Sequence, residues 1–152
     1  MDRPTGPIDA TLIPGDGNGP EITAAVTRVL DTWQFDVIVT TNLFGDILSD
    51  EIAGLVGGLG TAPGANIGER AAIFEAVHGS APDIAVRGIA NPLALMLAAA
   101  LRLEHVGHID LAAWLRAAID AALKVDGVRT GDLGSTATTV QFADAVVARL
   151  AS

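Results

Sequence analysis

The chain has 152 residues, half of them hydrophobic, and a formal net charge of −9 from 18 acidic and 9 basic residues. This length predicts one domain that can bury a real hydrophobic core. The acidic balance, without a basic run, argues against nucleic-acid binding, and the absence of cysteine excludes disulfides, thiolate nucleophiles and cysteine-ligated metals.

The N-terminus and the apolar segments carry no targeting or membrane signal. The most apolar stretch, residues 93–101, is much shorter than the roughly 20 residues that span a bilayer. It predicts a buried helix that also offers a surface to a partner. Residues 1–7 predict a disordered arm, and residues 8–152 a single domain. With no apolar signal segment in the first residues, we expect a cytoplasmic protein that does not bind membranes.

A strand, a glycine-bearing turn and a helix are predicted at the start of the domain. Residues 8–13 are β-compatible, and the helix is expected from Pro20, which suits a first helical position, to about Thr32. With a second strand at 36–41, these elements form a right-handed βαβ crossover with parallel strands. The glycines of the turn lack the spacing of a dinucleotide fingerprint.

The remaining elements are predicted from helical periodicity and from glycine, proline and threonine signals. They are a helix over 46–56, irregular chain over 61–70, a strand over 71–76, a loop over 78–87, helices over 91–105 and 109–124, and a last helix to about Leu150 capped by Thr138 or Thr139.

The predicted fold class is α/β, a three-layer domain in which about five helices flank a small, mostly parallel sheet. The sheet should contain the strands near 8–13, 36–41 and 72–76. Its core should hold Ile13, Val37, Val39, Ile73 and Phe74.

Asp46 and Asp50 lie about one turn apart on one face of the predicted helix. Hard divalent ions take carboxylate oxygens and water, so this pair is a plausible half of a magnesium or manganese site. The alternative is that Asp46, Asp50 and Glu51 only complement the positive end of the helix. Spacing alone favours this alternative, because acidic first turns are common.

Three linked segments then resemble a known family. They read NLFGDILSD from Asn42, GGLGTAPGANIG from Gly57 and FEAVHGSAPDIAVRGIANP from Phe74, and IPGDGNGPE at Ile13 is similar to the opening of the same family. The family is that of the isocitrate/isopropylmalate dehydrogenases, which are NAD(P)- and divalent-metal-dependent β-decarboxylating enzymes. The resemblance implies a reduced version of the family's large domain, since the central small domain is missing between Thr32 and Phe35.

The resemblance also implies a nucleotide site. The family's adenosine-binding loop matches His78, Gly79, Ser80, Ala81, Pro82, Asp83 and Ile84, and Asn91 corresponds to an asparagine at the adenine edge. A carboxylate at Asp83 can accept hydrogen bonds from both ribose hydroxyls and repels a 2′-phosphate, so NAD is expected over NADP. Taken singly, His78 would be a surface histidine and Asn91 a helix cap.

The same resemblance implies that the catalytic machinery is incomplete. The family needs a tyrosine, a lysine, a cluster of arginines and a further metal-binding aspartate. This chain has no tyrosine, and its one lysine, Lys124, does not match the catalytic motif. Asp46 and Asp50 would be an incomplete site for Mg²⁺ or Mn²⁺.

Three functions remain open. The first is a shortened relative that keeps an NAD or metal site but has lost the oxidative decarboxylation. The second is a repurposed isomerase, cyclase or lyase, with His78 and Glu75 as candidate catalytic residues near neutral pH. The third is a non-catalytic subunit that binds a partner. A small-molecule ligand and a homo-oligomer, most simply a dimer with a new interface, are expected, because the missing domain should leave apolar surface uncovered.

Overall fold

The computed structural model describes residues 40–151. The predicted strand 8–13, the helix 20–32 and most of the strand 36–41 therefore lie outside the described residues, with Ile13, Val37 and Val39. The last two residues of that strand, Thr40 and Thr41, are exposed and precede the first described helix without forming a strand. The chain divides into two compact units, Met1–Glu51 and Ile52–Ser152.

Helix α2 (Asn42–Val56) contains the predicted helix 46–56 and begins earlier than expected, at Asn42. It ends where Gly57 and Gly58 adopt φ angles of 130° and 94°. Residues with a side chain rarely adopt these angles, so the glycine pair stops the helix. The Gly58 N–H donates to the Ala53 carbonyl at 2.7 Å, which satisfies one of the last carbonyls of the helix.

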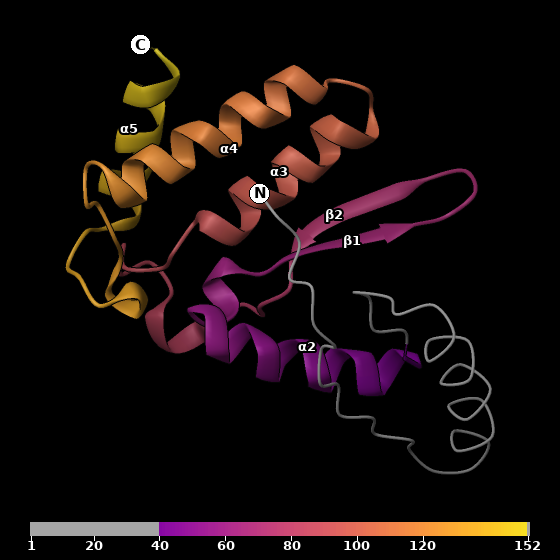
Figure 1. Cartoon of the computed structure of the whole chain (residues 1–152). Coiled ribbons are helices and arrows are strands. Elements are labelled where there is room, and N and C mark those ends of the chain that lie inside the picture. Colours follow the sequence, from indigo (N-terminus) through magenta and orange to yellow (C-terminus); the bar gives the residue numbers. More distant parts are fainter. Residues whose placement is uncertain (1–39, 152) are drawn as a thin grey trace, which may run out of the picture. The chain divides into compact units, whose positions relative to one another are not determined.

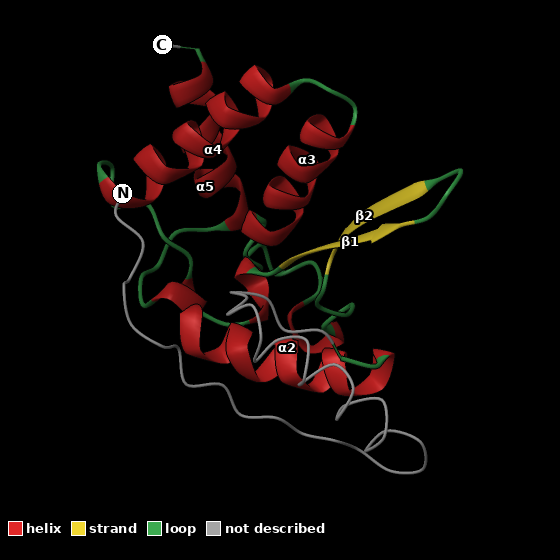
Figure 2. Ribbon diagram, turned by 45° about the vertical axis from the view of Figure 1, so that its right-hand side comes forward, coloured by secondary structure: helices red, strands yellow, loops and turns green. Residues whose placement is uncertain are grey.

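Strands β1 (Pro63–Ile67) and β2 (Ala72–Ala76) form an antiparallel hairpin (Figure 2). Ala65 lies opposite Phe74, and Gly68 donates to the Ala71 carbonyl at 2.9 Å to close the turn. The strand predicted over 71–76 is confirmed, but the irregular chain predicted over 61–70 is wrong. The pairing of these two strands is local and antiparallel; the parallel pairing was expected with strands that the structure does not describe.

The predicted core position of Ile73 is wrong, because its side chain is 62% exposed. Successive side chains of a strand point to opposite faces of the sheet. Phe74 is half-buried, with its ring 5.3 Å from the ring of His105 in α3. Since Phe74 faces α3, Ile73 points to the opposite face.

Helices α3 (Leu93–His105), α4 (Ile109–Lys124) and α5 (Thr139–Leu150) build the core of the second unit, with α4 packed against both others and the hairpin against α3 (Figure 1). The helices predicted over 91–105 and 109–124 are confirmed. Small side chains let α3 and α4 approach closely, because alanines of both helices are buried. The core cluster consists of Leu93, Ala118, Ile119, Ala122, Phe142 and Val146.

The predicted cap of the last helix is confirmed at Thr138. Its hydroxyl oxygen accepts from the Gln141 N–H at 3.2 Å, and Gln141 Oε1 accepts from the Thr138 N–H at 2.8 Å. This reciprocal pair is a capping box. Among the described residues, no helix is long and apolar enough to cross a membrane.

Candidate nucleotide site

The connection between β2 and α3, residues 77–92, contains the predicted nucleotide loop. Every residue from His78 to Asp83 is exposed, and Ile84 is half-buried. A short 3-10 helix, η2 (Pro82–Ile84), follows Ala81, whose φ of 42° is left-handed. A Cβ at Gly79 would meet no atom within 4 Å. The backbone beside His78 is therefore open to close approach by a ligand.

The ring of His78 is oriented by its own loop. Nδ1 lies 3.0 Å from the Gly79 carbonyl oxygen. A carbonyl oxygen only accepts, so this bond places a proton on Nδ1 and leaves Nε2 available to a further partner. Glu75 accepts from Asn66 Nδ2 at 2.8 Å across the hairpin. Within residues 40–151, His78 and Glu75 form no ion pair, so the structure does not join the two candidate catalytic residues.

The Asp83 carboxylate makes no hydrogen bond or ion pair within the described part of the chain, and the residue is exposed. Only its backbone oxygen is engaged, since it accepts from Arg87 Nη1 at 3.4 Å. Both carboxylate oxygens are thus available as acceptors. Such a group can take two hydroxyl donors at once.

Asn91 lies at the other end of the connection, and both ends of its side-chain amide are bonded. Oδ1 accepts from the Leu93 N–H at 3.0 Å, so Asn91 satisfies the first N–H of α3 from one residue before the N-cap, which is Pro92 and not Asn91 as considered. Nδ2 donates to Asp132 Oδ2 at 2.8 Å. No hydrogen bond joins Asn91 to residues 78–84 among those described.

Asp132 was not singled out from the sequence, where residues 126–139 are a polar loop. It lies in the short helix η3 (Gly131–Leu133), and its Oδ1 accepts from the hydroxyl of the fully buried Thr130 at 2.5 Å. Its contact with Asn91 joins residues 41 positions apart. No local pattern indicates a contact of this kind.

Thr139 fixes the end of the same connection to the start of α5. Its N–H donates to the Gly88 carbonyl at 2.9 Å, and its hydroxyl donates to the Ala90 carbonyl at 2.6 Å. The last residues before α3 are therefore held from two sides, by η3 and by α5. The loop that carries His78 and Asp83 is left exposed.

Asp46 and Asp50 are both exposed on α2, one helical turn apart. Because α2 begins at Asn42, neither residue belongs to its first turn, and the helix-end alternative loses its basis. In residues 40–151, no group of three or more His, Asp or Glu side chains could hold a metal ion. The two carboxylates are thus an incomplete ligand set within the described chain.

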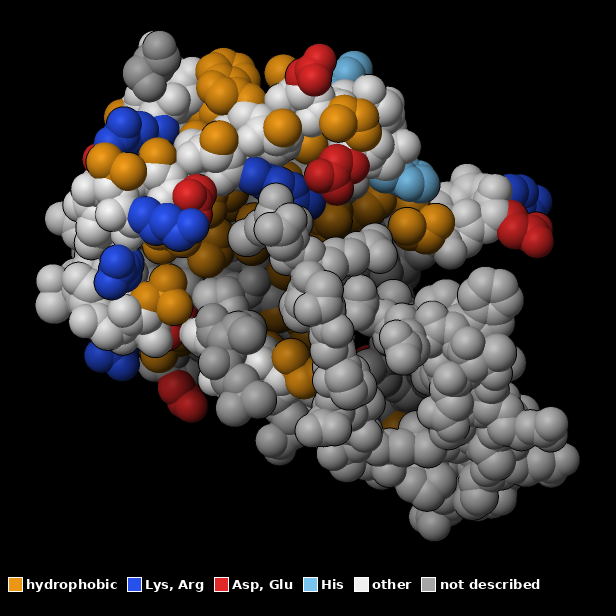
Figure 3. Space-filling model, in the orientation of Figure 1, with side chains coloured by type: hydrophobic (Ala, Val, Ile, Leu, Met, Phe, Trp, Pro, Cys, Tyr) orange, Lys and Arg blue, Asp and Glu red, His pale blue; other side chains and the backbone are white. Residues whose placement is uncertain are grey.

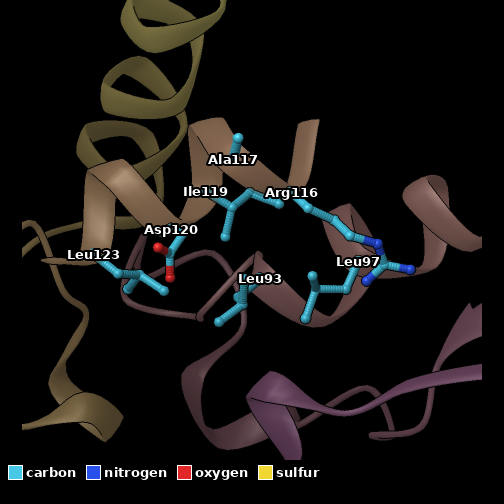
Figure 4. A pocket seen from close by; sticks show the side chains of 7 residues that line it. All are labelled: Leu93, Leu97, Arg116, Ala117, Ile119, Asp120 and Leu123. Carbon is cyan, nitrogen blue, oxygen red and sulfur yellow. The ribbon is translucent and has the colours of Figure 1, made fainter. Parts of the chain in front are cut away.

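An open groove of about 470 Å³ lies between α3 and α4. Figure 4 shows Leu93 and Leu97 of α3 opposite Ile119 and Leu123 of α4, with Arg116, Ala117 and Asp120 completing the wall. The charged groups are paired, because Arg116 binds Glu104 at 3.1 Å and Lys124 binds Asp120 at 2.6 Å. The groove contains none of the predicted site residues.

Comparison with known proteins identifies relatives for most of the chain. The family model described as isocitrate/isopropylmalate dehydrogenase matches residues 31–146. The 3-isopropylmalate dehydrogenase of Archaeoglobus fulgidus is 53% identical over 127 residues, which are 84% of this chain and 39% of the relative. A regulatory chain of the mitochondrial NAD isocitrate dehydrogenase of Dictyostelium discoideum is 49% identical over 123 residues, 80% of this chain and 35% of the relative.

A solved structure gives the same result. The crystal structure of isocitrate dehydrogenase from Methylococcus capsulatus matches with a TM-score of 0.74 and 50% identity, covering 86% of this chain and 39% of that one. The predicted fold class, a reduced α/β domain, is confirmed by this likeness. The chain spans 35–39% of the length of these three relatives.

Proposed function

The chain belongs to the isocitrate/isopropylmalate dehydrogenase family, and we propose that it binds NAD at the connection between β2 and α3. The observation that supports this best is the exposed loop from His78 to Asp83, with the Asp83 carboxylate unengaged within the described residues and Asn91 held at the far end. Backbone groups beside Gly79 and the side chains of His78, Asp83 and Asn91 would hold the nucleotide. When bound, the cofactor would accept a hydride from a substrate.

Asp83 is the residue expected to select between cofactors. A carboxylate that accepts hydrogen bonds from both ribose hydroxyls stabilises NAD. The same carboxylate repels the 2′-phosphate of NADP, because like charges at short range are unfavourable. The described chain places no arginine on this carboxylate, since Arg87 contacts only the Asp83 backbone oxygen.

Calorimetric titration tests this proposal. The native chain should bind NAD more tightly than NADP, and Asp83→Asn should narrow the difference because the neutral amide no longer repels the phosphate. Asp144→Asn, which neutralises an exposed carboxylate on α5, should leave the preference unchanged. Equal affinity of the native chain for the two nucleotides, or no binding of either, would refute the proposal.

We also propose that this chain alone does not oxidise and decarboxylate isocitrate or 3-isopropylmalate. It has no tyrosine, and Lys124 is engaged by Asp120 on the exposed side of α4. Two of its arginines, Arg116 and Arg149, form bidentate pairs with carboxylates and so serve the fold. Loss of a catalytic unit of this kind costs many orders of magnitude in rate.

The corresponding assay measures NADH absorbance with either substrate, in the presence of Mg²⁺ or Mn²⁺. The expected rate equals that of the solution without protein. Metal-dependent NADH production above this background would contradict the proposal, provided that heat-denatured protein does not produce it.

We also propose that Asp46 and Asp50 bind Mg²⁺ or Mn²⁺ with low affinity. Carboxylates suit Mg²⁺ and Mn²⁺ chemically, and two like charges one turn apart destabilise a helix by about 0.2–0.5 kcal/mol, which a bound cation would offset. The described chain supplies no third ligand, so water would fill the remaining positions. Broadening of the amide resonances of α2 by Mn²⁺ should occur in the native chain and be lost in Asp46→Asn.

A non-catalytic role within a larger assembly is the second candidate. It is favoured by the likeness to a regulatory chain in Dictyostelium discoideum and by the absence of tyrosine. The chain should then change the rate of a full-length isocitrate dehydrogenase from the same organism when the two are mixed. A rate that does not change at any ratio of the two proteins would remove this candidate.

A further inference from the structure

We propose that Asp132 is a positioning residue, which fixes the side-chain amide of Asn91 in the one orientation that reads the adenine edge of a nucleotide. The inference rests on the proposed nucleotide binding. It adds Asp132, which the sequence did not indicate. This residue lies in η3, between α4 and α5, and so far from the nucleotide loop along the chain. The carboxylate itself is not expected to touch the reacting atoms.

The orientation of the Asn91 amide follows from its two partners. The Asp132 carboxylate only accepts hydrogen bonds, so it must face the Asn91 Nδ2 group, at 2.8 Å. The Leu93 backbone N–H only donates, so it must face Oδ1, at 3.0 Å. A flip of the amide would break both bonds and place two acceptors against each other.

Two bonding positions of the amide remain after these contacts. Nδ2 has two N–H groups and Oδ1 has two lone pairs, and one of each is used. To read a base edge, these must be the N–H and the lone pair on the side of the amide away from Cβ, which lie next to each other in one plane. Adenine presents its exocyclic amine next to a ring nitrogen, which is the pattern that an asparagine amide reads with two hydrogen bonds.

Asp132 is itself held in place, as a positioning residue must be. Its other oxygen accepts from the Thr130 hydroxyl at 2.5 Å, and Thr130 is fully buried. The chain passes close to it at Gly60, where a Cβ would lie 2.9 Å from Asp132 Oδ2 and 3.1 Å from the Asn91 Cβ. A side chain at position 60 would displace the Asp132 carboxylate or the Asn91 side chain, so three separate segments meet at the Asn91 amide.

The first arm of the test needs no nucleotide. The side-chain amide protons of Asn91, followed by nitrogen-15 NMR of the full chain, should exchange slowly with water in the native protein and faster in Asp132→Ala. Asp132→Asn should restore slow exchange, because its Oδ1 can accept from Asn91 while its amide donates to the Thr130 hydroxyl. Asp144→Ala is the matched control and should change nothing.

The second arm measures selectivity. The probes are NAD and its deaminated analogue, in which hypoxanthine replaces adenine. The native chain should prefer NAD by about tenfold, the value of one good hydrogen bond. Asp132→Ala should lose this preference and Asp132→Asn should keep it, whereas a merely structural role would weaken both ligands equally.

The outcomes separate the two claims. If the native chain binds neither dinucleotide, the proposed function fails, and the NMR arm alone decides whether Asp132 orients Asn91. If NAD binds but Asp132→Ala keeps both slow amide exchange and the tenfold preference, the positioning role is overturned. Thermal unfolding of each variant shows whether a loss of selectivity arises from a loss of folded protein.

Discussion

Val86 adopts a left-handed backbone with φ of 55°, and its side chain is fully exposed. A β-branched residue is strained in this region by roughly 1–2 kcal/mol, whereas asparagine tolerates it. Val86→Asn should therefore raise the free energy of unfolding by about 1 kcal/mol, since no packing is lost. Val125→Asn is the control, because Val125 is exposed at a φ of −90° and should show no gain. Denaturant unfolding of the two variants measures the difference, and equal midpoints would contradict the strain.

The Asp126–Arg149 pair predicts a pH dependence. Arg149 donates from Nε at 2.9 Å and from Nη2 at 2.5 Å, and these bonds lower the pKa of Asp126 below its ordinary value of 3.8. A carboxyl whose pKa is lower in the folded than in the unfolded chain stabilises the fold above its unfolded pKa. That contribution disappears as the pH falls through the lowered pKa.

Asp126→Asn should therefore lower the denaturant midpoint near neutral pH. In strong acid, the variant and the native chain should have the same midpoint. Asp144→Asn, whose carboxyl has no described partner, should show no gap at either pH. A gap for Asp126→Asn that persists in strong acid would mean that the variant acts through packing and not through the ion pair.

At the residue scale, the position of the candidate nucleotide loop was predictable because it is a continuous motif, and the binding roles of its residues stay predictions. The loop predicted over 78–87 contains no α-helix or strand, because glycine and proline disfavour both locally, and its residues from His78 to Asp83 are exposed. Asp132 was not predictable, since its role depends on a contact with Asn91 across 41 positions. A bond from Asn91 to the start of α3 was foreseen, although the N-cap itself is Pro92, and the second bond of the same amide was not foreseen.

At the scale of elements, the capping box of α5 carries a direct prediction. Thr138→Ala removes the side-chain acceptor of the Gln141 N–H, so the free energy of unfolding should fall by about 1 kcal/mol. Thr136→Ala, in the exposed loop just before, is the matched control and should be neutral. Urea unfolding followed by circular dichroism would measure both, and an equal loss in the two variants would argue against the cap.

The helices were predicted closely, and the hairpin was not. α3 and α4 have apolar side chains at helical spacing. The prediction from this local pattern agrees with the folded structure because the same side chains form the core. The segment of β1 consists of proline, glycine, alanine, asparagine and isoleucine, which have little strand preference as a group. Only its pairing with β2 makes it a strand. Ile73 was misplaced for the same reason, since its face depends on where β2 packs.

At the scale of the whole molecule, self-association stays a prediction. The surface that favours it most is formed by exposed apolar side chains of α4. Residues 93–101 were expected to form a buried helix that also offers a surface to a partner, and Leu93, Ala94, Ala98 and Ala100 are buried within the helical unit. On α4, by contrast, Leu111 and Trp114 are 46% and 51% exposed one turn apart. Hydrophobic side chains lie among charged ones over α3 and α4 in Figure 3.

We therefore expect a homodimer that buries Leu111 and Trp114, because large apolar side chains grouped on a surface favour association and a two-fold dimer is the simplest closed form. Both protomers carry a net charge of −9, so they repel, and added salt should strengthen the dimer by screening this repulsion. Light scattering over a range of protein and salt concentrations should show the mass of two chains, rising with salt. Trp114→Glu should return the mass of one chain, whereas Ser135→Glu, which adds the same charge in an exposed loop, should not. One-chain mass for the native protein at every concentration and salt would refute the dimer.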